Sequence, residues 1–134
     1  MIAIIAATAN SSKAIRLVYN MLMTKFIDII SPIYQNLLKK CSAQKISVNL
    51  DVQDLTKRID DPEKIERFYT TEIRRALKLC SAGDKITLSQ NGDRYSVKNS
   101  SKTTLDKDIV EKLRADGFEV RARFGYDTII SLNA

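Results

Sequence analysis

Histidine and tryptophan are absent from this chain of 134 residues, and only four glycines occur in it. Without histidine, the chain cannot form a serine–histidine–aspartate triad, a histidine proton shuttle or a histidine-containing zinc site. Each glycine falls at a predicted helix end or turn, so none remains for a phosphate-binding loop or a dinucleotide fingerprint. We therefore expect no enzyme activity, no cofactor and no metal, and we assign no catalytic residue.

Cysteine is also scarce. The two cysteines, Cys41 and Cys80, are too few for a disulfide framework. Both come at the end of a predicted helix, where the helix dipole raises the pKa of a thiol, so we expect buried, inert packing. The first apolar run, Met1 to Ala7, has no basic segment before it and is shorter than the roughly 20 residues that cross a bilayer. We expect a protein that is neither secreted nor membrane-bound.

Positive charge is present in excess. Lysine and arginine number 22 against 16 acidic residues, and the formal net charge of +6 favours anionic partners such as nucleic acid. The length and the hydrophobic content of 44% are typical of one globular domain, residues 1–134.

The most clearly marked element is a helix over residues 62–81. Asp61 supplies a capping carboxylate, Pro62 suits the first helical position, and Gly83 follows the predicted end. Apolar residues recur every three or four positions and predict one buried face, made of Ile65, Phe68, Tyr69, Ile73, Ala76, Leu77 and Cys80.

A hairpin is predicted after this helix. Strands 85–89 and 94–98 each alternate with period two, and Asn91-Gly92 between them is a strong turn signal. With these two residues as the loop, the predicted cross-strand pairs are Leu88 with Tyr95 and Ile86 with Val97.

The remaining elements follow from the same patterns. Residues 13–41 predict a long amphipathic helix, with a kink at Ser31-Pro32 or a restart there with Ser31 as the cap. Thr103, with Asp106 three residues later, opens a helix over 104–115. In the C-terminal hairpin, a loop from Gly125 to Asp127 gives the predicted pairs Phe124 with Thr128, Ala122 with Ile130, and Val120 with Leu132.

Together these elements predict an α+β fold in two layers. We expect one mostly antiparallel sheet of about five strands packed against the helices. The predicted strands are 46–52, 85–89, 94–98, 118–124 and 128–132, and the predicted helices are 13–41, 62–81 and 104–115.

Two basic surfaces are candidates for binding nucleic acid. One is the side of helix 62–81 that could follow a phosphate backbone, which carries Lys64, Arg67, Thr71, Arg74, Arg75 and Lys78. Three glutamates neutralise much of this side, Glu63, Glu66 and Glu72, so we favour a solvated face with i,i+4 charge pairs. The other candidate is an open sheet face with Arg94, Lys98, Arg121 and Arg123.

The predicted helix 13–41 has an apolar stripe that covers about half of its circumference, more than one sheet would cover. Two interpretations stay open. The helix is either central to the core, or part of its apolar face meets another protein chain. The possible partner surface consists of Tyr19, Met23, Ile27, Ile30 and Tyr34.

The C-terminal sequence reads LRADGFEV from Leu113 to Val120 and GYDTIISL from Gly125 to Leu132. This ending resembles that of short proteins encoded by tailed bacteriophages. The resemblance implies a phage origin and a place in the virion or the host cytoplasm, and no functional residue follows from it. We expect a non-catalytic structural protein that binds other chains, its own or those of phage or host, in a virion assembly. The alternative is a basic regulator that binds DNA or RNA in the host cell.

Overall fold

The computed structural model describes residues 24–122 and 127–134. Their elements are α3 (Phe26–Gln44), β1 (Ser47–Val52), α4 (Pro62–Leu79), β2 (Lys85–Asn91), β3 (Arg94–Asn99), α5 (Lys107–Ala115), β4 (Glu119–Arg121) and β5 (Thr128–Asn133). The five strands form one sheet in the order β1-β2-β3-β5-β4. Strand β1 is parallel to β2, and the other neighbours are antiparallel. The predicted α+β class and mostly antiparallel sheet are confirmed.

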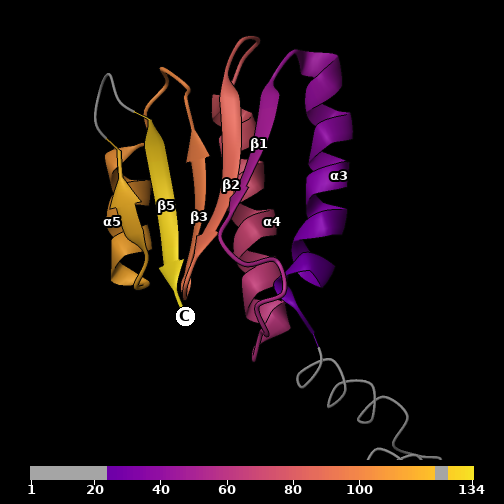
Figure 1. Cartoon of the computed structure of the whole chain (residues 1–134). Coiled ribbons are helices and arrows are strands. Elements are labelled where there is room, and N and C mark those ends of the chain that lie inside the picture. The colour runs from indigo at the N-terminus through magenta and orange to yellow at the C-terminus, as the bar shows by residue number, and fades with distance from the viewer. Residues whose placement is uncertain (1–23, 123–126) are drawn as a thin grey trace, which may run out of the picture.

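The helices make the second layer. Helices α4 and α5 lie on one face of the sheet, behind it in Figure 1, and α3 runs along the β1 side. Helix α4 starts as the sequence predicts: the Asp61 side chain accepts a hydrogen bond from the Lys64 amide at 3.2 Å, and Pro62 follows at the first position. The chain then turns at Gly83, whose φ is +93°.

An aromatic cluster holds the layers together. The Phe26 side chain of α3 is fully buried, with its ring centre 5.9 Å from that of Tyr69 on α4 and 5.5 Å from that of Tyr95 on β3. The Tyr69 hydroxyl donates to the carbonyl of Ser89 in β2, so its polar end is satisfied inside the core. Burial of these large rings fixes both helices against the sheet.

The first hairpin differs from the prediction by two residues. Asn91 pairs with Arg94, so the turn is Gly92-Asp93, and Leu88 lies opposite Val97 rather than Tyr95. The predicted faces survive because a shift of two keeps every side chain on its side of the sheet. The neighbouring segment supports this register, since Gly92 donates its amide hydrogen to the Gln53 side chain at 2.7 Å.

The C-terminal hairpin shows the same kind of error. Val120 lies opposite Ile130, not Leu132 as predicted. The predicted pairing of Ala122 with Ile130 is therefore also wrong. Phe124, which was predicted to pair with Thr128, lies outside the described residues. Val120 and Ile130 still face the helix layer together, because this shift also equals one full period of the strand.

Two helix boundaries also differ. Helix α3 begins at Phe26 after an extended Lys25, so the predicted helix 13–41 is wrong at residues 24–25, while residues 13–23 lie outside the described part. Pro32 lies inside a continuous α3 that reaches Gln44, so the restart at Ser31 is also wrong. Helix α5 begins after Asp106, not after Thr103. The reason is local, since the Thr103 amide donates to the Ser101 side chain at 3.1 Å and Leu105 is buried, which keeps this stretch in an irregular loop.

Candidate functional site

The basic side of α4 forms one wall of a groove between α4 and α5. The groove contains two adjoining cavities of about 430 and 360 Å³. Both are lined by Thr71, Arg75 and Ile109, so they are contiguous. This side of α4 remains a solvated face, as favoured from the sequence, since its side chains are exposed except for the half-buried Arg75. The ion pair on it within the described residues, Glu72–Arg75, has i,i+3 rather than the predicted i,i+4 spacing.

The smaller cavity, here called the basic cavity, lies at the C-terminal end of α4. Three cations of α4 line it, Arg74, Arg75 and Lys78. Its opposite wall is the loop before α5 together with the first turn of that helix. This loop is held in place by the Ser101 hydroxyl, which donates to the Leu79 carbonyl at 2.6 Å. This hydrogen bond ties the loop to the end of α4, on the opposite side of the cavity.

The basic cavity offers three kinds of contact to a ligand. The cations suit phosphate oxygens. Leu79, Leu105 and Ile109 supply apolar surface for a ring. Asp106 is the cap residue of α5 but makes no capping hydrogen bond with its side chain, so its carboxylate is available to accept from an amino group. Cations, an apolar wall and an acceptor are together the chemistry of a nucleotide site.

The larger cavity, here called the apolar cavity, lies toward the start of α4. Its apolar lining is Phe68, Ile109, Leu113, Phe118 and Leu132. The rings of Phe68 and Phe118 are stacked, with centres 5.8 Å apart. Lys64, Arg67, Lys112 and Asp116 add charged groups to the lining.

A buried ion pair belongs to this wall. The Glu72 side chain is only 3% exposed, and its Oε2 atom lies 3.1 Å from Nε of Arg75. Burial raises the pKa of the Glu72 carboxyl, and the neighbouring Arg75 opposes this rise. The sequence predicts that Glu72 neutralises part of this side; it does pair with Arg75, but from a buried position. Its spacing of three and four residues from Tyr69 and Phe68 was the signal that could have placed it on the buried side.

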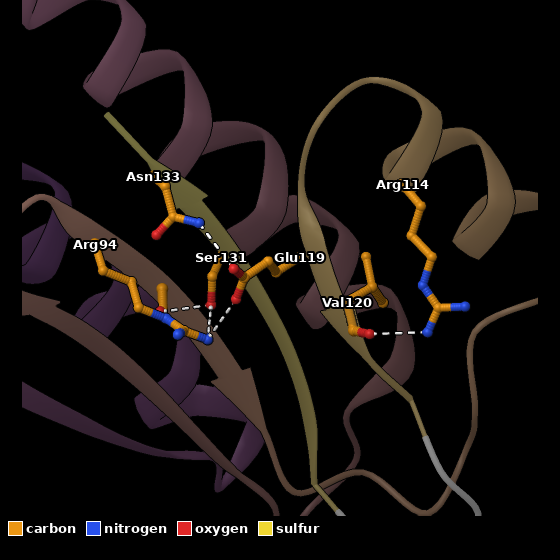
Figure 2. Close-up of polar contacts among 7 residues, drawn as sticks. Arg94, Arg114, Glu119, Val120, Ser131 and Asn133 are labelled. Atoms are coloured by element: carbon orange, nitrogen blue, oxygen red, sulfur yellow. Dashed lines mark hydrogen bonds and ion pairs between the residues drawn. The ribbon is translucent and has the colours of Figure 1, made fainter.

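The arginines proposed for nucleic acid lie elsewhere. Arg94 and Arg121 line a cavity of about 220 Å³ on the sheet face that points away from α4 and α5. Arg94 is paired there with Glu119, at 2.9 Å, and a second oxygen of Glu119 accepts from Asn133 (Figure 2). Lys98 is half-buried on the same face, and Arg123 lies outside the described residues. The structure brings Arg94 and Arg121 together, but around a carboxylate.

The proposed partner surface is divided. Ile27 is 41% exposed and Tyr34 is half-buried on α3, whereas Ile30 is buried in the core at 1% exposure. Including Ile30 in an interface was therefore wrong. Tyr19 and Met23 lie outside the described residues.

The cysteines are both free. Burial raises the pKa of the Cys41 thiol. Burial, and then the nearby Asp84, raise the pKa of Cys80 to about 11. Both thiols therefore stay protonated near neutral pH, which makes them poor nucleophiles.

No protein-family model and no curated protein matches the sequence. Solved structures do match the fold. The catalytic domain of the histidine kinase ThkA, in a nucleotide-free form, has a TM-score of 0.61 at 13% identity, covering 80% of this chain and 90% of that one. A histidine kinase from Burkholderia phymatum STM815 has a TM-score of 0.61 at 12% identity, covering 98% and 79%. ThkA in complex with the response regulator protein TrrA has a TM-score of 0.59 at 15% identity, covering 81% and 40%.

These likenesses establish the fold of histidine kinase catalytic domains and overturn three expectations. A phage virion component, a nucleic-acid-binding regulator and a protein without enzyme activity were expected, whereas the similar structures named above are histidine kinases. The resemblance of the C-terminus to phage proteins stays a prediction. No helix within 24–122 and 127–134 is long and apolar enough to span a membrane. The fold of this chain is that of the catalytic domains of histidine kinases.

Proposed function

We propose that this chain is a kinase-type catalytic domain that binds a nucleoside triphosphate in the basic cavity. The acceptor of the phosphoryl group lies on another protein. The observation that carries the proposal is the basic cavity itself, where Arg74, Arg75 and Lys78 face the loop before α5. Its volume of about 360 Å³ is within the usual range for small-molecule sites. The likeness of the fold to kinase catalytic domains supports it.

Each part of a nucleotide has a matching group. The phosphates lie against the cations at the end of α4, with the Thr71 hydroxyl as a further donor. The base lies against Leu79 and Leu105, and the Asp106 carboxylate accepts from its amino group. An adenine base has such an amino group, whereas a hypoxanthine base does not, so ATP is expected to bind better than ITP.

The acceptor lies outside this chain if it is a histidine, because none of the 134 residues is histidine. ThkA, which has this fold, is found in complex with the protein TrrA. We therefore infer that this chain also acts on, or together with, another protein chain. The exposed part of α3 around Ile27 is one surface available for such a contact.

Titration calorimetry with ATP, in the presence and in the absence of Mg²⁺, tests the proposal. The double variant R74Q/K78Q removes two of the three cations and keeps the Glu72–Arg75 pair intact. A charge-assisted hydrogen bond contributes roughly 1.5–3 kcal/mol, so the variant should bind ATP at least about tenfold more weakly. D106N should reduce the preference for ATP over ITP.

The matched control is K98Q/R121Q, which removes the same charge from the opposite face of the sheet. It should bind ATP as the unchanged chain does. Equal losses in both double variants would mean that only net charge attracts ATP. Failure of the unchanged chain to bind ATP at millimolar concentration would remove the proposed function.

A further inference from the structure

The apolar cavity has a composition that the nucleotide proposal does not use. Its floor belongs to the core of the fold, since it is lined by the buried side chains of Phe68, Leu113 and Leu132. The ring of Phe118 stacks on that of Phe68 with an angle of 25° between their planes. A flat apolar group would pack against these rings in the offset or edge-to-face arrangements that aromatic pairs favour.

The charged groups of this cavity are mostly cationic. Lys64 and Arg67 are three residues apart on α4 and are therefore neighbours on the helix surface, and Lys112 faces the same cavity from α5. Within the described part of the chain none of these three forms an ion pair. The charge of Glu72 is matched by Arg75, which leaves Asp116 as the remaining acid against three cations.

We propose that the apolar cavity is a second ligand site, which takes a small aromatic acid with its ring on Phe68 and Phe118 and its carboxylate among Lys64, Arg67 and Lys112. Its volume of about 430 Å³ is sufficient for a ligand of this size. Charge complementarity selects an anion, because a neutral ligand would leave the cations without a partner. The stacked rings select an aromatic body, because they offer flat surfaces rather than a narrow channel for a chain.

The site is separate from the basic cavity in the residues that decide binding. Lys64, Arg67 and Phe118 line only the apolar cavity, and Arg74 and Lys78 line only the basic one. Variants can therefore test the two sites independently. If ATP does not bind but an aromatic acid does, the proposed function fails and this inference stands.

The probe is 2-naphthoate, titrated into the full chain and followed by its own fluorescence, which is separable because the chain has no tryptophan. We expect one naphthoate per chain, bound about tenfold more tightly than the neutral 2-naphthamide. Octanoate, an aliphatic acid, should bind more weakly than naphthoate. The variant F118L keeps an apolar side chain without a ring and should reduce this preference.

The double variant K64Q/R67Q should weaken naphthoate binding about tenfold, and the control R74Q/K78Q should change it by less than about twofold. Both variants should melt as the unchanged chain does, since the exchanged side chains are exposed. Equal binding of naphthoate and naphthamide, equal or tighter binding of octanoate, or no binding of naphthoate would overturn the proposal. A loss confined to R74Q/K78Q would place the naphthoate in the basic cavity and overturn it too.

Discussion

Arg75 stands between the two cavities of the groove, and its Nε atom lies 3.1 Å from the buried carboxylate of Glu72. The Arg75 side chain is 28% exposed, whereas the Glu72 side chain is 3% exposed. The positive charge of Arg75, one of the three cations that line the basic cavity, is therefore already neutralised by the buried carboxylate of Glu72. Removal of that carboxylate should change both ligand binding and the dependence of stability on pH.

Replacing Glu72 with glutamine should increase the affinity for ATP. Glutamine has nearly the same shape but no charge, so Arg75 is freed to contact a phosphate. A gain of about 1 kcal/mol, roughly fivefold in the dissociation constant, is expected for one charge-assisted contact. Calorimetry measures it, and E66Q on the exposed side of the same helix is the matched control.

An E72Q variant that binds ATP no better than E66Q would show that Arg75 does not contact the phosphates. The proposal for the basic cavity would then depend on Arg74 and Lys78 alone. An equal gain in both variants would indicate a general effect of net charge.

The stability of the same variant should respond to pH differently from that of the unchanged chain. Burial raises the pKa of Glu72 in the folded state above the ordinary value of 4.5. Such a group contributes stability below its unfolded pKa and loses that contribution as pH rises through its folded pKa. Glutamine does not ionise. The melting temperature of E72Q relative to the unchanged chain should therefore rise as the pH increases through and above 4.5.

The comparison cancels the other titrating groups, because they are shared by both proteins. The pairing with Arg75 already contributes to the folded pKa of Glu72, so its loss in E72Q is part of the same pH-dependent difference. A difference in melting temperature that stays constant or falls with pH would contradict the raised pKa.

The aromatic cluster should carry much of the stability. Phe26 is 0% exposed and contacts both Tyr69 and Tyr95, so F26A should lower the free energy of unfolding by about 3–5 kcal/mol. The next residue, Ile27, is 41% exposed, and I27A should cost less than about 1 kcal/mol. Urea unfolding of both variants measures the difference. Similar losses would mean that α3 is not anchored through Phe26.

The elements of this fold could be predicted because their signals are local. The Asp61-Pro62 start of α4 and the alternation of β2 and β3 were read from a few adjacent residues each. The register of the strand pairs was harder to predict than the elements themselves. Alternation with period two gives the face of Leu88 and Tyr95, but it does not distinguish a pairing from one shifted by two residues, and both hairpins were misjudged by that amount.

The cations of the groove were noted in the sequence, but as a candidate nucleic-acid surface that was not favoured, and their setting was not predicted. Lys64, Arg67, Arg74, Arg75 and Lys78 were identified as one side of α4, and the structure places all of them along the groove. The opposing wall includes α5, which lies on the same face of the sheet as α4 and connects β3 to β4 across β5. That strand order depends on pairing between distant segments, for which the sequence holds no local signal.

The turn of the first hairpin gives a direct test of its register. Gly92 has a φ of +60°, and a β-carbon built there would have no neighbour within 4 Å, so only the backbone opposes a side chain at this position. G92V should lower the free energy of unfolding by roughly 1–2 kcal/mol, because a β-branched residue resists positive φ.

Asn91 pairs with Arg94 as the last residue of β2, is exposed, and has no positive φ. N91V introduces the same residue one position earlier, where valine suits an extended strand, and it should be neutral or slightly stabilising. With Asn91-Gly92 as the loop of a type I′ turn, both positions would need positive φ and both variants would be destabilised. Urea unfolding of the two variants therefore decides between the registers, and an equal loss in N91V and G92V would contradict the turn at Gly92-Asp93.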